Sequence, residues 1–199
     1  MNKLIKGAVA TAAGVALLMG GAGTFAYWND SVGVTGGTIT AGTLTVADSG
    51  TAGSWTVQKD GAGTAVAVPD ISTFVASPGD KFSYTKTVVI NATGNNLVAT
   101  LLLAPGSITP ASNTPANNAL AAYLTKTASI AVTGAGITAG GVAGTYTVTP
   151  GTTGISNRTV TITVGINFPK DPAAGTENNT KTGSVSLAGL AVQLNQVNP

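Results

Sequence analysis

Carboxylates are the main side chains here that could act in catalysis, because the sequence contains no histidine and no cysteine. That absence excludes Cys/His and Ser/His/Asp nucleophiles and histidine-based zinc sites. Two carboxylates could still act as an acid and base pair, and the candidates are Asp48, Asp60, Asp70 and Asp80. Each adjoins Gly, Ser, Pro or Ile at the end of an expected strand, where Asp commonly forms turns. We therefore expect turn roles for all four, no catalytic residues and no enzymatic activity.

Metal and phosphate sites are not indicated either. A calcium site needs several oxygen ligands that converge on one point, and Asp70, Asp80 and Asp171 show no clustering in the sequence. The glycine-rich stretch 139–144 is not followed by a lysine, so it does not match a phosphate-binding loop. We expect it to be a flexible turn, and we expect neither a metal nor a cofactor.

The N-terminal end of the chain has the layout of an export signal. Lys3 and Lys6 form a short positive start, and the run 7–19 is apolar and rich in Ala, Val and Leu. One alternative is a retained transmembrane helix. Residues 4–23 are just long enough to cross a bilayer, but they lead directly into a cleavage pattern. Another is a type IV pilin leader, which would need a long apolar helix in the mature chain. Gly and Thr crowd residues 33–42 instead.

A cleavage site follows the apolar run. The small residues Thr24 and Ala26 would stand at positions −3 and −1 of a cut after Ala26, the small-x-small pattern that a signal peptidase needs. Cleavage would make Tyr27 the new N-terminus and would leave 173 of the 199 residues. A chain of that length suits one domain.

The sequence across the cut reads Gly20-Gly21-Ala22-Gly23-Thr24-Phe25-Ala26-Tyr27-Trp28-Asn29-Asp30-Ser31. It resembles the signal-peptide junction of the TasA/camelysin family, which are secreted proteins processed by a dedicated SipW-type signal peptidase. Residues 39–46 resemble the first strand of that family, and residues 77–81 resemble its Pro-Gly-Asp turn before a long strand. The resemblance covers roughly residues 15–104 and leaves out the middle of the chain.

The resemblance implies a jelly-roll sandwich that acts as a fibre or biofilm-matrix subunit at the cell surface. By similarity, the freed segment of about Tyr27 to Val46 would add as a strand to the next subunit, in donor-strand complementation. The residues expected to form this donor strand are Tyr27, Trp28, Val32, Val34 and Ile39. For Tyr27 and Trp28 the alternative is recognition by the signal peptidase followed by packing on the sandwich. The glycines in 33–37 favour a flexible tether around a shorter pairing segment. A metallopeptidase label used for the camelysin branch does not transfer, because the chain has no His-Glu-x-x-His motif.

The charge of the chain argues against nucleic acid and anionic membranes as partners. Charged residues make up 8% of the sequence, against about 25% in typical soluble proteins. The nine basic residues include Lys3 and Lys6, so removal of the leader leaves seven against seven acidic residues. Such a neutral, Thr-rich surface has little self-repulsion and tends to self-associate. Contact with a membrane is expected only through the uncleaved signal peptide.

Alternating apolar and polar residues predict β-strands through most of the mature chain. Residues 81–91 form the longest such run, and residues 159–164 alternate Thr with Val or Ile. The side chains expected on one face of the first run are Phe82, Tyr84, Lys86, Val88 and Ile90, and those expected to point inward in the second are Val160, Ile162 and Val164. Further strands are expected at 38–47, 54–59, 64–68, 97–103, 129–133, 145–149 and 182–195, with a bulge at Gly189 in the last.

One short helix is expected at 116–126, with Asn117 or Asn118 as its cap. Eight to ten short strands with frequent turns predict an all-β fold, an antiparallel β-sandwich or jelly roll. The expected organisation is a signal peptide at 1–26, a flexible N-terminal segment or donor strand at 27–42, and one β-sandwich domain at 43–199.

These features lead to one functional hypothesis and one rival. The first is a secreted structural subunit that assembles with itself, and with accessory matrix proteins, by β-strand addition of the mature N-terminus. The rival is a monomeric cell-surface module for binding or adhesion. Aromatic residues make up 5% of the sequence, which gives little material for a stacking platform for sugars.

Overall fold

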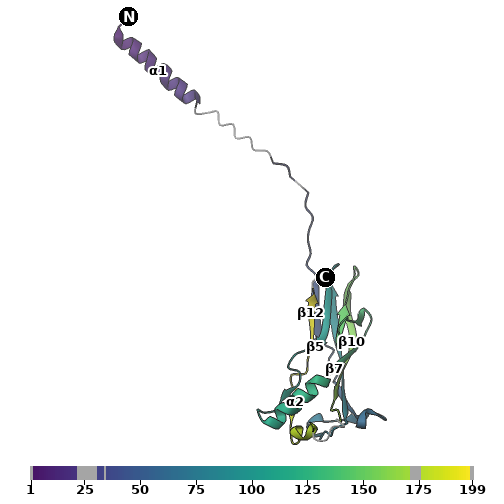
Figure 1. Ribbon diagram of the computed structural model, residues 1–199. Coiled ribbons are helices and arrows are strands. Elements are labelled where there is room, and N and C mark those ends of the chain that lie inside the picture. Colours follow the sequence, from purple (N-terminus) through teal and green to yellow (C-terminus); the bar gives the residue numbers. More distant parts are fainter. Residues whose placement is uncertain (1, 22–30, 34, 171–175, 198–199) are drawn as a thin grey trace. The chain divides into compact units, whose positions relative to one another are not determined.

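The computed structural model describes residues 2–21, 31–33, 35–170 and 176–197. It divides into two units, Met1–Ile39 and Thr40–Pro199. The first unit contains helix α1 (Lys3–Gly21), which coincides with the apolar run of the expected export signal (Figure 1). In the described residues, no helix combines the length and the hydrophobicity that crossing a membrane requires.

The larger of two main sheets, sheet A, has six strands and is built around two long ones. β4 and β10 pair antiparallel from end to end, and β7 lies on the far side of β10. On the other side of β4, β2 pairs with its first half and β1 with its second half. The strands are β1 (Thr43–Asp48), β2 (Ser54–Gln58), β3 (Val66–Val68), β4 (Lys81–Thr93), β7 (Ser129–Thr133) and β10 (Ile155–Asn167).

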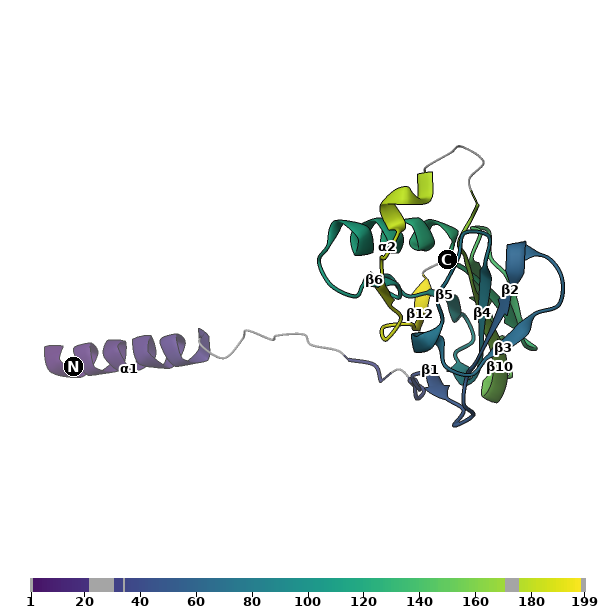
Figure 2. The same ribbon diagram turned by 90° about the horizontal axis from the view of Figure 1, so that it is seen from below.

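The smaller sheet, sheet B, has the strand order β12-β5-β9-β8 and forms a second layer against sheet A (Figures 1 and 2). Its strands are β5 (Val98–Leu103), β8 (Ile137–Ala139), β9 (Thr145–Val148) and β12 (Val192–Val197). A short pair is formed by β6 (Thr109–Pro110) and β11 (Val185–Ser186). The remaining elements are helix α2 (Pro115–Thr127) and the 3-10 turns η1 (Lys59–Gly61), η2 (Ile71–Thr73) and η3 (Thr176–Thr180).

The two sheets share one apolar core. Its largest fully buried side chains are Ile90 and Val160 from sheet A and Leu101 and Val148 from sheet B. Every strand pair in the described residues is antiparallel. The predicted all-β, antiparallel class is therefore confirmed.

The predicted alternation is confirmed in both long strands. Phe82, Val88 and Ile90 are buried on one face of β4, and the aliphatic residues of 160–164 are buried on β10. Lys86 shares the inward face of β4, as its position in the alternation requires. Its ammonium pairs with the exposed carboxylate of Asp48 at the end of β1.

Helix α2 lies where the sequence predicts a helix, but the expected cap is wrong. Thr114 caps the helix, since its hydroxyl accepts a hydrogen bond from the backbone N–H of Asn117, and Pro115 occupies the first turn. Both choices are favoured at helix starts. Asn117 is buried and instead joins α2 to Ser112 and Ser184 through its side-chain amide.

Two expected strands differ from the structure for reasons of pairing. The strand expected at 38–47 begins only at Thr43, because its partner β4 ends at Thr93 and the chain turns there. The strand expected at 182–195 is broken, and a turn in which Leu190 N–H donates to the Leu187 carbonyl takes the place of the expected bulge at Gly189. β11 pairs with β6 whereas β12 pairs with β5, so the two parts of the expected strand belong to different sheets.

Candidate strand-addition surface

The segment that precedes β1 carries apolar side chains that are exposed in the described part of the chain. Residues 31–33 and 35–42 have no regular secondary structure and are exposed throughout. Val32 is 86% exposed and Ile39 is 98% exposed. The other expected donor residues, Tyr27, Trp28 and Val34, lie outside the described residues. The expected cleavage residues Thr24 and Ala26 lie there as well.

The point where this segment joins sheet A is closely fitted. The backbone N–H of Thr43 donates to the hydroxyl of Thr93 over 2.9 Å, and the two threonine hydroxyls lie 3.0 Å apart. Immediately before it, the Cα of Gly42 packs on the backbone of β4, where an added Cβ would lie 2.0 Å from the Thr93 carbonyl oxygen. Only glycine fits at such an approach. Gly42 and Thr93 therefore fix where the free segment ends and the sheet begins.

The other end of β1 is held by an ion pair and a hydroxyl contact. The Lys86 ammonium lies 2.9 Å from a carboxylate oxygen of Asp48, and the Ser49 hydroxyl donates to the Thr87 carbonyl over 2.8 Å. The hydrogen bond from Lys86, followed by that from the backbone N–H of Gly50, lowers the pKa of Asp48 below its ordinary value of 3.8. These contacts fill the gap on β4 between β1 and β2.

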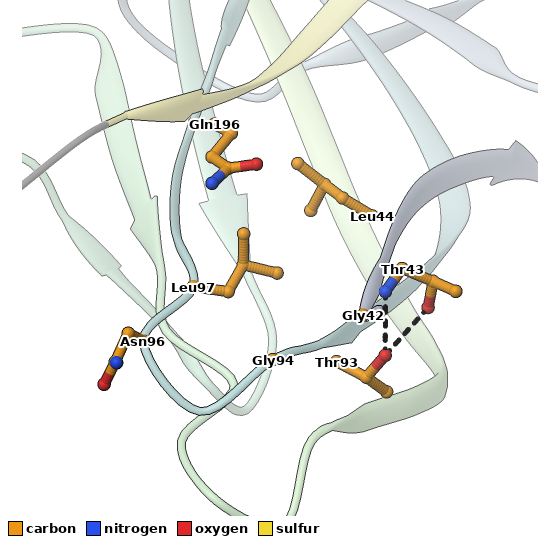
Figure 3. A pocket seen from close by; sticks show the side chains of 8 residues that line it. All are labelled: Gly42, Thr43, Leu44, Thr93, Gly94, Asn96, Leu97 and Gln196. Carbon is orange, nitrogen blue, oxygen red and sulfur yellow. Dashed lines mark hydrogen bonds between the residues drawn. The ribbon is translucent and has the colours of Figure 1, made fainter. Parts of the chain in front are cut away.

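A hollow of about 320 Å³ opens at the start of β1, between the two sheets. The side chains of Leu44 on β1, Leu97 after the β4–β5 turn and Gln196 on β12 surround it (Figure 3). The rest of its wall is formed by Gly42, Thr43, Thr93, Gly94 and Asn96. The wall contains no charged side chain, so the hollow suits an apolar or neutral polar group rather than an ion.

The four aspartates weighed as a catalytic pair occupy separate turns. Asp48 accepts from the Gly50 N–H, Asp70 from the N–H and hydroxyl of Ser72, and Asp80 from the Ser77 N–H. The two hydrogen bonds from Ser72, that from its hydroxyl first, lower the pKa of Asp70. These contacts match the turn roles that the sequence favours.

Asp60 has a backbone φ of 51° and borders a second hollow with Gly79, Asn167 and Lys170. Among the described residues, no group of three or more His, Cys, Asp or Glu side chains could hold a metal ion. Asp171 lies outside those residues. Of the described residues that line this hollow, Asp60 is the one carboxylate and Lys170 the one cation.

An aromatic pair lies on the inward face of sheet A. The rings of Trp55 and Tyr84 lie 4.9 Å apart at an angle of 38°. Both are half-buried and pack against the core. Tyr84 also covers Gly53, where a Cβ would meet its hydroxyl at 2.0 Å. The pair therefore acts mainly in packing on the inward face of β2 and β4.

Sequence reasoning missed the three residues that define this surface most closely. Gly42 and Thr93 are 51 positions apart, so their contact depends on the pairing of β1 with β4. Gln196 faces the hollow only because β12 is the edge strand of sheet B. Gly42 could have been identified from the sequence, because it is a glycine at the point where a glycine-rich segment meets an alternating strand.

No protein-family model matches the chain, and neither a curated protein nor a solved structure is detectably similar to it.

Proposed function

We propose that this chain is a secreted structural subunit of extracellular fibres or of a biofilm matrix. In this account, the N-terminal segment of one copy adds as a β-strand to the next copy, and repetition of that step builds the polymer. The two-sheet domain would be a jelly roll of the TasA/camelysin type. Self-association would be the main interaction, with accessory matrix proteins as further partners.

The observation that carries the proposal is the exposure of Val32 and Ile39 on a segment that pairs with no strand in the described residues. Burial of a Val or Ile side chain is worth about 1.5–3 kcal/mol. A second copy that covers these side chains would also supply backbone partners for a segment with no regular structure. Both gains offset the conformational entropy that the segment loses when it is ordered.

Helix α1 fits the same account as the apolar part of an export signal. A SipW-type signal peptidase would cut after Ala26 and free Tyr27. Before the cut, the segment 27–42 is tied to the leader, so strand addition would begin only after export. The peptidase would then control both secretion and the start of assembly.

The rival hypothesis, a monomeric binding module, finds less support. Its best candidate contact surface is the pair Trp55 and Tyr84, but both rings pack against the core. A ring that already buries much of its surface in packing offers little face for a sugar or peptide. This favours the structural role over the binding module.

Negative-stain microscopy tests the proposal with two chains, one that starts at Tyr27 and one that starts at Ala41. In the described part of the chain, all the buried hydrophobic residues lie between Val68 and Phe168, so both chains retain the core. The proposal predicts filaments from the first chain and monomers from the second. Monomers from both at high concentration would contradict it and would favour the binding module.

A further inference from the structure

The strands at the sheet edges differ in how well they could accept an added strand. β1, β3, β7, β8 and β12 each pair on one side only in the described part of the chain. β3 and β8 have three residues each, and β1 ends in the charged Asp48. The longest uncharged edges are β12, with six residues, and β7, with five. Length and lack of charge are the properties that leave an edge open to pairing.

Of these two edges, β12 is the less obstructed. The hydroxyl of Tyr146 on sheet B donates to the carbonyl of Ile130 on β7 over 3.3 Å, so a side chain already engages the backbone of that strand. In the described residues, no side chain makes a hydrogen bond to the backbone of residues 192–197. The edge of β12 is therefore the more accessible one.

The core is also incompletely covered beside β12. Leu44 and Val46 point inward from β1 but are only half-buried. β1 and β12 contact each other across the two sheets, and the hollow lies between them at the level of Leu44 and Gln196 (Figure 3). A strand added to β12 would extend sheet B and would cover Leu44 and Val46 from the side.

We propose that the free edge of β12 receives the N-terminal segment of a second copy of this chain, with apolar side chains of that segment in the hollow beside Leu44 and Leu97. This inference rests on the proposed function and adds the acceptor site to it. Residues 31–42 and 192–197 contain no charged side chain. Pairing over 31–42 therefore desolvates no charged side chain, which would be costly at an interface, and Asp30 would lie at the end of the added strand.

The alternation of side chains decides which positions lie on the outer face of the combined sheet. In an incoming strand over 31–34, Val32 and Val34 would share one face and Ser31 the other. Ile39 would join the Val32 face only if the glycines at 36 and 37 interrupt the alternation. On β12, Leu194 is half-buried and points inward, whereas Asn195 is exposed on the outer face. Ser31 and Asn195 are thus the positions at which probes can be placed without disturbing the apolar contacts.

Disulfide cross-linking tests the acceptor directly, because the chain has no cysteine of its own. A chain from Tyr27 that carries Ser31→Cys is mixed with one that carries Asn195→Cys and is oxidised mildly. A disulfide requires Cα atoms within about 7 Å, so neighbouring strands link and distant ones do not. Gln193→Cys, two residues away on the same face, covers the alternative register. The matched control is Ala131→Cys on the exposed face of β7.

The proposal predicts that mixed dimers with the Gln193→Cys or Asn195→Cys chain exceed those with the β7 control by at least about tenfold, which corresponds to 1.4 kcal/mol. Filaments with cross-links mainly to β7 would overturn the β12 acceptor and leave the proposed function intact. Absence of both filaments and cross-links would overturn both.

A second set of variants gives an independent measurement. Gln193→Lys together with Asn195→Lys places two charges on the outer face of β12, a device that natural edge strands use against pairing. These side chains are exposed, so the fold, checked by circular dichroism, should persist. We expect the lowest concentration that supports filaments to rise at least about tenfold. Ala131→Lys with Thr133→Lys on β7 should leave it unchanged, and the reverse pattern would overturn the proposal.

Discussion

The Thr93 hydroxyl accepts a hydrogen bond from the backbone N–H of Thr43 over 2.9 Å, where the first strand of sheet A begins. On the N-terminal side of this contact, the described residues 31–33 and 35–42 have no regular secondary structure. On its C-terminal side, β1 follows β4 in register from Thr43–Thr93 to Asp48–Val88. The contact therefore marks the boundary between the N-terminal segment, which we propose pairs with the next copy, and the β-sheet domain of its own copy.

Gly42→Ala should destabilise the domain by about 1–3 kcal/mol, because its Cβ would lie 2.0 Å from the Thr93 carbonyl oxygen and the backbone must shift to make room. Gly37→Ala is the matched control, since no atom lies within 4 Å of the position its Cβ would take. Urea unfolding of both variants measures the difference. Equal stability of the two would show that Gly42 is not tightly packed against β4.

Thr93→Val should cost about 1 kcal/mol, because it keeps the shape of the side chain but removes the acceptor for the Thr43 N–H and the contact with its hydroxyl. The exposed Thr159→Val on β10 is the control, since its hydroxyl has no hydrogen-bond partner in the described residues. Amide hydrogen exchange should also speed up across β1 in the Thr93 variant alone. Unchanged protection of β1 would argue against Thr93 as its anchor.

The ion pair at the far end of β1 predicts a pH dependence. The pKa of Asp48 lies below its ordinary value in the folded chain, first because Lys86 donates to it and then because Gly50 does. A carboxyl with a lowered pKa stabilises the fold fully above its unfolded pKa, near pH 4. That contribution is lost as the pH falls through the folded-state value. Thermal unfolding from pH 6 to pH 2 should therefore show a smaller acid loss in Asp48→Asn than in the natural chain.

Lys86→Met separates this effect from acid destabilisation elsewhere. It keeps an apolar stem on the inward face of β4 and removes the charge that bonds to Asp48. The NMR-measured pKa of Asp48 should rise toward its ordinary value, while that of Asp70, which depends on Ser72, should stay lowered. An unchanged pKa of Asp48 would mean that Lys86 does not set it.

Asn117→Ala should destabilise the domain by about 1–2 kcal/mol, because it removes the hydrogen bonds by which this buried side chain joins α2 to Ser112 and Ser184. The Asn117 side chain accepts from the Ser184 N–H over 2.7 Å and donates to Ser112. The neighbouring Asn118→Ala removes an exposed side chain and should cost less than about 0.5 kcal/mol. Chemical denaturation that shows equal losses for the two would contradict the cross-linking role of Asn117.

Local patterns in the sequence predict most of this fold. The alternation of Thr with Val and Ile in 159–164 places Val160, Ile162 and Val164 in the core without reference to other parts of the chain. The helical spacing of Leu120 and Leu124 likewise predicts the buried face of α2. These elements obey short-range rules, and the side chain of each residue follows from the geometry of its own segment.

The remaining features depend on partners far away in the sequence. β1 begins at Thr43 because β4 ends at Thr93, and the last strand breaks because β6 and β5 pair with different parts of it. The composition predicts a surface with few charges. It does not predict which strand lies at a sheet edge without a partner on one side. The hollow between Leu44 and Gln196 forms only when β1 and β12 meet. The donor residues of the proposed site therefore come from the sequence and stay a prediction, whereas the acceptor is visible only in the arrangement of the strands.

The central claim is that one copy receives the N-terminal segment of another, and peptide competition measures this most directly. Filament growth of the chain from Tyr27 is followed by light scattering with increasing amounts of a synthetic peptide of residues 27–42. The account predicts that the peptide occupies the acceptor and shortens or stops growth in a dose-dependent way, whereas a scrambled peptide of equal composition has no effect. Undiminished growth at a large excess of the peptide would contradict strand addition as the mechanism of assembly.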